Sequence, residues 1–376
     1  MSSDARTRSR RTVRAAYAAL AALLSLAPAL AGCGHDPGHG AAPAATRIML
    51  VGDSITQGST GDYTWRYRLW EHLRGDRVPV RFVGPRHDLW DDTRSSALGF
   101  VFGTRYADPA FAANPAANAH DAFVGIRASA VAPGIGAVVR AYRPGYLIVL
   151  LGINDLASGA APAQVAGSMR QLLLNARAAA PGLRFAVVQA PPAAPVPAAK
   201  VAAYDGLLDR LGAQLSTHRS PVAVTGAPAG YSAERSACTD TWDGTHPNAA
   251  GELKIAAAVA GTLHSAFGIG SAYPRPLPRV PAGPQPPPVL TAQSGAGAIR
   301  LRWTGTPGAT AYRVWRREPG EPWVRLPLPL NAFTRDFTDG GLLAGLRNGN
   351  AYQYRIEADK GSCGSYSGTV TEMPRA

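Results

Sequence analysis

Cysteine is scarce in this chain, with only Cys33, Cys238 and Cys363 in 376 residues. So few cysteines exclude a small fold that is held together by a network of disulfides. In an exported protein, Cys238 and Cys363 either pair or stay as thiols. Because they fall in different predicted domains, we expect separate thiols.

The sequence also lacks a basic stripe interleaved with aromatic residues, although its formal net charge is +13. The charge is spread along the chain, so nucleic-acid binding is not expected. A length of 376 residues with 46% hydrophobic content is enough to form two cores, which predicts two domains.

The N-terminal segment 1–33 has the pattern of a secretion signal, with an Arg-rich start and an apolar run that ends in small residues. The run is Ala-rich, barely long enough to cross a bilayer and without a second charged flank, which disfavours a permanent transmembrane helix. Leu-Ala-Gly-Cys at 30–33 resembles a bacterial lipoprotein cleavage box, in which Cys33 becomes the lipidated N-terminus. Ordinary cleavage after Ala31 is the alternative. The prediction is an extracellular or cell-surface protein of a bacterium, attached to a membrane only if Cys33 carries a lipid.

Residues 34–45 form a Gly-, Pro- and Ala-rich stretch that predicts a flexible tether, and the first domain follows at 46–270. Apolar runs without strict alternation are typical of strands buried on both faces. They lie at 47–51, 80–83, 147–151, 185–188 and 222–224, and helical spacing is found at 65–73, 163–179, 201–215 and 249–267. This order predicts an α/β domain with a parallel sheet and helices on both faces.

The segment between Pro85 and Phe123 is too long for an ordinary connection and has little periodicity. Two interpretations have equal weight: a loop that covers the substrate, or an irregular excursion that packs on the domain.

A Pro-rich stretch at 271–288 predicts a stiff, extended linker, and the chain then changes character at 289–376. Apolar residues there alternate with Arg or Gln in short runs, as half-buried antiparallel strands require. The segment resembles a fibronectin type III domain, on Trp303, Tyr312, Asp339 and a tyrosine corner at Tyr352. Most such domains act as spacers.

The first strand of the α/β domain leads into Gly-Asp-Ser at 52–54, which places Ser54 where a parallel strand turns toward a helix. Ligands bind at this carboxyl edge in open α/β sheets. A serine there has an exposed hydroxyl and a backbone N–H close to a helix N-terminus, both useful for attacking a carbonyl and holding the oxyanion. A simple helix cap is the alternative.

The segment 243–248, Asp-Gly-Thr-His-Pro-Asn, favours the catalytic interpretation of Ser54. Asp243 can accept a hydrogen bond from one imidazole nitrogen of His246 while the other nitrogen faces a serine hydroxyl. A structural histidine at a helix start is the alternative. Asn154, in Gly-Ile-Asn-Asp at 152–155, follows the central strand and can donate to an oxyanion, and Gly125 is a further candidate donor.

These four blocks, in this order over about residues 46–268, resemble those of the SGNH (GDSL-type) hydrolases. The resemblance implies a three-layer α/β/α, flavodoxin-like fold, with Ser54 as nucleophile, His246 as general acid and base, and Asp243 as its orienting group. It also implies an oxyanion hole formed by Ser54 N–H, Gly125 N–H and Asn154. Phe-Val before Gly125 departs from the commonest form of the second block. Neither a metal nor a cofactor is expected.

Within this superfamily, the segments 52–56, 67–70 and 82–84 are similar to the acetylxylan esterases of carbohydrate esterase family 3. This similarity implies an ester hydrolase that removes acetyl or other short acyl groups from a polysaccharide. We expect a monomer. Alternatives are a lipase, lysophospholipase or aryl esterase of the same fold, an acyltransferase, and a surface glycan-binding protein without catalytic activity.

Overall fold

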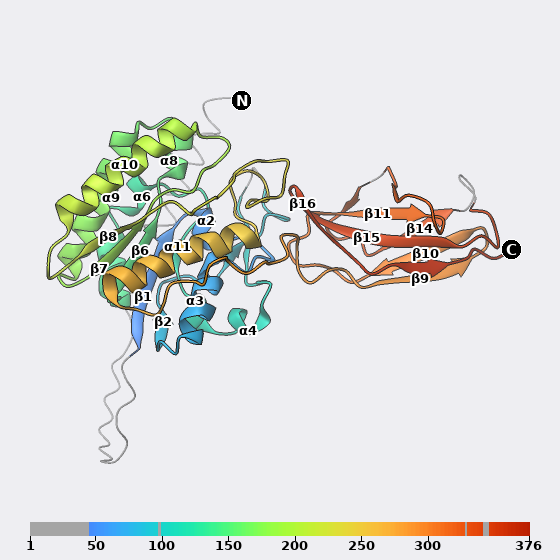
Figure 1. Ribbon diagram of the computed structural model, residues 1–376, viewed down its shortest axis with the longest axis horizontal. Coiled ribbons are helices and arrows are strands. Elements are labelled where there is room, and N and C mark those ends of the chain that lie inside the picture. Colours follow the sequence, from blue (N-terminus) through green and yellow to red (C-terminus); the bar gives the residue numbers. More distant parts are fainter. Residues whose placement is uncertain (1–44, 97–98, 328, 341–345) are drawn as a thin grey trace, which may run out of the picture.

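The computed structural model describes residues 45–96, 99–327, 329–340 and 346–376. The predicted signal segment, Cys33 and the tether up to residue 44 lie outside the described residues. The described chain forms an α/β domain followed by an all-β domain (Figure 1).

The α/β domain is built on a parallel sheet with the strand order β2-β1-β6-β7-β8. Its strands are β1 (Thr46–Gly52), β2 (Val80–Phe82), β6 (Tyr146–Leu150), β7 (Arg184–Val188) and β8 (Val222–Thr225), and the short β5 (Asp121–Ala122) pairs with the end of β1. Apart from their first one or two residues, β1, β6 and β7 are buried, because helices cover both faces of the sheet. All five predicted strands are confirmed.

Helices lie on opposite sides of this sheet, which makes the three predicted layers (Figure 1). On one side α3 (Trp65–Gly75) packs against α11 (Ala249–Phe267). On the other side α9 (Pro162–Ala179) packs against α7 (Ile135–Tyr142) and α10 (Ala198–Leu215). The four predicted helices are present, whereas α7 was not expected.

The segment 85–123 is a packed excursion with short elements of its own. They are β3 (Leu89–Trp90), β4 (Phe102–Gly103), α4 (Pro109–Ala112) and α5 (Pro115–Asn118). Phe111 is fully buried, and the buried Arg66 guanidinium donates to the carbonyl oxygens of Gln57 and Asn118 at 2.9 and 2.7 Å. Arg66 thereby ties the excursion to the helix that starts at Ser54. Of the two interpretations of segment 85–123, an irregular excursion that packs on the domain describes most of it.

The C-terminal domain consists of two antiparallel sheets. One contains β9 (Leu290–Gly295), β10 (Ala298–Trp303) and β14 (Asp336–Gly340), and the other contains β11 (Ala311–Arg317), β12 (Val324–Arg325), β13 (Leu330–Asn331), β15 (Tyr352–Lys360), β16 (Cys363–Tyr366) and β17 (Val370–Glu372). Trp303 and Tyr312 contact each other in its core, and the hydroxyl of Tyr352 accepts a hydrogen bond from Arg347 N at 3.0 Å. The bond runs back to the backbone, as in a tyrosine corner. The fibronectin type III assignment stays a prediction.

The two domains are in direct contact, and the expectation of separate thiols is wrong. Cys238 of the α/β domain and Cys363 of β16 form a disulfide, with Cα atoms 5.0 Å apart. The two cysteines meet although they belong to different domains, because the turn between β15 and β16 packs against the loop that contains Cys238. The linker is also docked, because the Tyr273 ring stacks on His72 with centroids 4.0 Å apart.

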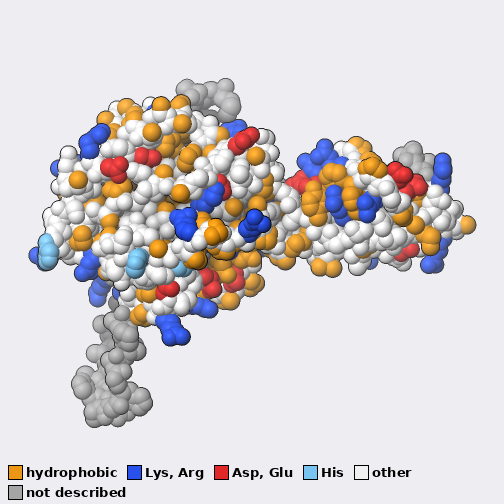
Figure 2. All heavy atoms as spheres, viewed as in Figure 1, with side chains coloured by type: hydrophobic (Ala, Val, Ile, Leu, Met, Phe, Trp, Pro, Cys, Tyr) orange, Lys and Arg blue, Asp and Glu red, His pale blue; other side chains and the backbone are white. Residues whose placement is uncertain are grey.

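On the face shown in Figure 2, basic and acidic side chains are interspersed over both domains. In the part of the chain that the structure describes, every helix is too short or too polar to cross a membrane.

Candidate active site

Ser54 lies at the carboxyl end of β1, as predicted, and begins the short helix α2 (Ser54–Gln57). Asp53 caps this helix, because its side chain accepts a hydrogen bond from Ile55 N at 3.0 Å. Gly52 allows the tight turn, since a Cβ at this position would lie 2.1 Å from Thr56 Oγ1. The turn therefore fixes the Ser54 hydroxyl at the edge of the sheet.

The structure brings His246 and Asp243 to this serine from a loop 192 residues away. His246 Nε2 lies 2.9 Å from Ser54 Oγ, and His246 Nδ1 lies 2.7 Å from Asp243 Oδ2. Asp243 Oδ1 also accepts hydrogen bonds from the backbone N–H groups of Thr245 and His246, at 2.9 and 2.8 Å. With its proton on Nδ1, His246 donates to Asp243 and can accept the Ser54 proton at Nε2.

The charges around the imidazole raise its pKa. Burial alone would lower the pKa of His246, but the hydrogen bond and charge of Asp243, with smaller contributions from Asp53 and Asp62, outweigh burial. Burial acts in the opposite direction on Asp243, and the hydrogen bond and charge of His246 overcome it, so the pKa of Asp243 falls well below its usual range. Asp243 is consequently ionised at neutral pH and can accept the Nδ1 proton of His246 in a hydrogen bond.

Asp53 is a second carboxyl group beside Ser54. Burial raises its pKa to about 7, although the Ile55 N–H and the charge of His246 pull it down. Its Oδ2 atom lies 3.2 Å from Asn154 Nδ2. Asp53 therefore acts as a hydrogen-bond acceptor in the described structure.

Asn154 comes from α8 (Ile153–Ala157), directly after the central strand β6. Its amide nitrogen also lies 3.2 Å from the carbonyl oxygen of Ile126, so the side chain points to the segment that contains Gly125. Both contacts are long for an N–H donor. The neighbouring Asp155 is structural, because it accepts from Ala128 N at 2.9 Å.

Gly125 lies in the turn between β5 and α6 (Ala128–Val131), with φ of +73°. Two hydrogen bonds hold this turn beside Ser54: Phe123 N donates to Gly52 O at 3.1 Å, and Val124 N donates to Gln57 Oε1 at 2.8 Å. Open space surrounds the position that a Cβ of residue 125 would take. A positive φ and an open face agree with the choice of glycine here.

Sequence reasoning missed Trp90, whose ring centroid lies 5.4 Å from that of His246. Trp90 belongs to the excursion 85–123, so this segment both packs on the domain and reaches the candidate site. No local sequence pattern predicts that Trp90 contacts His246, because the β3–β4 hairpin determines the position of its ring. Among the described residues, His, Cys, Asp and Glu form no group of three that could hold a metal ion.

The parallel sheet, with a hydrogen-bonded Ser, His and Asp at its carboxyl edge, has the architecture of a serine hydrolase. The family model described as GDSL-like Lipase/Acylhydrolase matches residues 48–259, and the chain belongs to this family. The protein is therefore a carboxylic ester hydrolase of the SGNH type.

The chain is also similar to solved structures of carbohydrate esterases. A carbohydrate esterase family 3 protein from Talaromyces cellulolyticus is 25% identical, with a TM-score of 0.48, over 60% of this chain and 100% of that chain. A family 3 carbohydrate esterase from Clostridium thermocellum is 21% identical, with a TM-score of 0.46, over 60% of this chain and 100% of that chain. No curated protein matches the chain.

Proposed function

We propose that this protein is an exported esterase that removes acetyl or other short acyl groups from a polysaccharide, with Ser54, His246 and Asp243 as its catalytic triad. The observation that carries the catalytic part is the continuous hydrogen-bonded path from Ser54 Oγ through the imidazole to Asp243. The substrate class comes from the similarity of segments 52–56, 67–70 and 82–84 to acetylxylan esterases. Export is supported by the predicted signal and by the Cys238–Cys363 disulfide, since such bonds persist in oxidising surroundings.

Acyl transfer in this site proceeds in two steps. His246 Nε2 takes the Ser54 proton while Oγ attacks the ester carbonyl, and the tetrahedral intermediate then expels the alcohol, which receives that proton from His246. Water attacks the acyl-enzyme with His246 again as the base, which releases the acid and restores the Ser54 hydroxyl. Asp243 stays ionised and holds the imidazolium in place.

The oxyanion is held by the backbone N–H groups of Ser54 and Gly125 and by the amide of Asn154. The long contact of Asn154 Nδ2 with Ile126 O is the one exchanged for the oxyanion, while the contact with Asp53 keeps the amide oriented. A single such donor contributes about a hundredfold to a thousandfold to turnover.

The test is hydrolysis of p-nitrophenyl acetate, butyrate and octanoate, together with acetate release from acetylated xylan. The processed protein is compared with Ser54→Ala, which should reduce kcat by roughly 10⁶-fold. Activity confined to short acyl chains and lost in the variant is the expected result. Preference for long chains would instead indicate the lipase alternative. A folded protein that hydrolyses none of these esters would refute the proposed function.

A further inference from the structure

We propose that the C-terminal domain contributes a residue, Lys360, that positions the catalytic groups of the α/β domain. Lys360 holds the loop that carries Asp243 and His246 against the segment that follows Ser54. This inference rests on the proposed function of the Ser54 site and extends it to a residue more than a hundred positions beyond His246.

The Lys360 side chain extends out of its own domain. It is at the end of β15, yet its ammonium group forms an ion pair with Asp62 Oδ1 at 2.7 Å and donates to Thr60 O at 2.8 Å in the α/β domain. Lys360 is only 2% exposed, and Asp92 lies 3.9 Å away. Burial would lower the pKa of Lys360, but Asp62 and Asp92 outweigh it and keep the ammonium charged. A charged lysine this deep is tolerated only because its partners are fixed around it.

On one side, Lys360 secures the segment after the nucleophile. The Asp62 Oδ2 atom accepts hydrogen bonds from Ser59 N at 2.6 Å and Ser59 Oγ at 3.0 Å. Thr60 N in turn donates to Trp90 O at 2.8 Å, and the Trp90 ring contacts His246. The ion pair of Lys360 and Asp62 is therefore connected through residues 59 and 60 to Trp90, which contacts the imidazole of His246.

On the other side, Lys360 contacts the histidine loop through Trp242. The ammonium nitrogen lies 4.9 Å from the centroid of the Trp242 ring, a cation–π distance. Trp242 is buried, directly precedes Asp243, and donates from its backbone N–H to His246 O at 2.8 Å. One side chain thus contacts both the segment after Ser54 and the base of the loop that carries its two partners.

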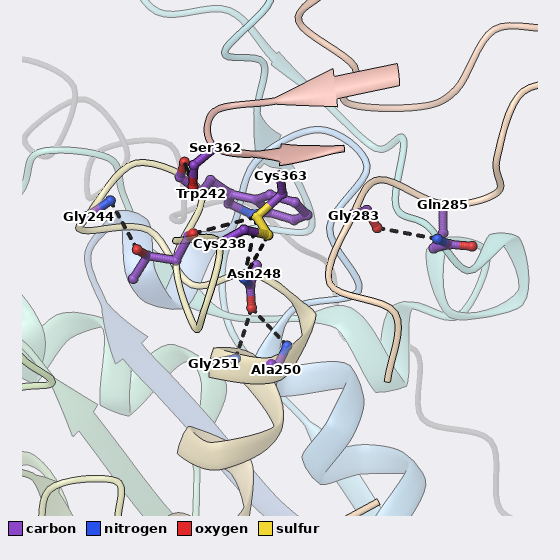
Figure 3. Close-up of a disulfide and its surroundings, with 11 residues drawn as sticks. Cys238, Trp242, Gly244, Asn248, Ala250, Gly251, Gly283, Gln285, Ser362 and Cys363 are labelled. Carbon is purple, nitrogen blue, oxygen red and sulfur yellow. Dashed lines mark hydrogen bonds between the residues drawn. A yellow bond between two sulfur atoms is a disulfide. The ribbon is translucent and has the colours of Figure 1, made fainter. Parts of the chain in front are cut away.

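The turn that follows Lys360 holds the same loop at two further points. The Trp242 carbonyl accepts from Ser362 N at 2.7 Å and Ser362 Oγ at 3.2 Å, and Cys363 is joined to Cys238 (Figure 3). The intervening Gly361 has φ of +56°, and a Cβ there would lie 1.9 Å from Trp242 O. Such close backbone contact is incompatible with a flexibly tethered domain. It also explains why this turn requires glycine.

Within residues 241–248 only Asp243 is exposed to solvent. The Asp243 side chain is 48% exposed, while Trp242 at the base of the loop is 5% exposed. Apart from the hydrogen bond from Ala194 N to Gly244 O at 2.7 Å, the position of the imidazole relative to Ser54 Oγ therefore depends on how the base of the loop is held. Misplacement of a catalytic group by about 1 Å can lower turnover roughly a hundredfold.

The test is Lys360→Met in the full chain, because methionine is also unbranched, is only one atom shorter than lysine, and carries no charge. We expect kcat to fall by roughly tenfold to a hundredfold, with KM changed less than about twofold, because the change affects the histidine loop and no substrate contact. A proton NMR spectrum at acidic pH supplies a second readout: the Nδ1–H signal of His246, shifted downfield by its bond to Asp243. That signal should broaden or move upfield in the variant. A folded variant with the kcat and the His246 signal of the unmodified protein would overturn the proposal.

Two further variants control for stability. Asp62→Asn combined with Lys360→Met leaves no unpaired buried charge at residue 62, and it carries the test if the single variant does not fold. Arg316→Met removes an ion pair with the buried Asp339 inside the C-terminal domain, 2.9 Å long. It should weaken that domain without lowering kcat or moving the His246 signal. Equal losses of kcat in the Arg316 and Lys360 variants would show that general stability, rather than positioning, is responsible, and the proposal would fail.

Failure of the proposed function can be told apart from failure of this inference. If the unmodified protein hydrolyses no ester, the esterase assignment is wrong. The His246 signal still reports whether Lys360 holds the loop, because the measurement needs no substrate.

Discussion

Replacing both Cys238 and Cys363 with alanine should lower the free energy of unfolding by up to about 5 kcal/mol. The disulfide closes a loop with a sequence separation of 125 residues. In the chain-entropy description, the loss grows with the logarithm of loop length and is about 5 kcal/mol for a loop of this size. Residual structure in the unfolded chain reduces this value, so a measured loss of about 2–5 kcal/mol is expected.

The measurement is urea denaturation followed by tryptophan fluorescence and circular dichroism. Buried Trp65 and Trp242 in the α/β domain and Trp303 in the C-terminal domain report on both parts. The single variant Cys238→Ala is the matched control, because it removes the crosslink but leaves the buried sulfur of Cys363. It should lose nearly as much stability as the double variant. An unchanged midpoint, or a single variant that loses only half as much, would refute the crosslink argument.

The site geometry supports three further predictions. Asp243→Asn should lower kcat by about four orders of magnitude with little change in KM. The amide oxygen would stay with the backbone N–H groups of Thr245 and His246, so the NH2 group would face Nδ1 and favour the wrong tautomer; steady-state kinetics at saturating ester checks this. Since neutral His246 is the base and its pKa is raised above 6.5, kcat/KM of the unmodified protein should rise with pH and reach half its maximum above pH 6.5; a midpoint below that would contradict the geometry. Asn154→Ala should lower kcat about a hundredfold to a thousandfold, and a loss under about threefold would exclude its amide from the oxyanion hole.

The α/β domain could be predicted because its strands carry their own signal. Runs such as 147–151 are short and continuously apolar, which is typical of a strand covered on both faces of a sheet. The same regularity locates Ser54 and Asn154, because each directly follows a strand whose end is visible in the sequence. Helix α7 was missed because its eight residues give too short a pattern to separate from the irregular segment before it.

The excursion 85–123 and Trp90 could not be placed in advance. Arg66 holds the excursion through hydrogen bonds to carbonyl oxygens, and backbone acceptors leave no trace in the sequence. The contact of Trp90 with His246 likewise joins segments that are far apart in the chain. Long-range contacts of this kind form only when the whole domain has folded, so no local sequence pattern predicts them.

Local sequence patterns were sufficient to predict the parallel sheet, the change to alternating strands after the proline-rich segment, and the residue types at the carboxyl edge. Hydrophobic periodicity and turn chemistry are local properties, so they can be recognised without coordinates. The pairing of Cys238 with Cys363 and the insertion of Lys360 into the α/β domain became visible only with the folded coordinates. Both contacts depend on how the two domains pack against each other. The surfaces that meet consist of a few side chains and the turn at Gly361, and they have no periodicity that could be recognised in the sequence.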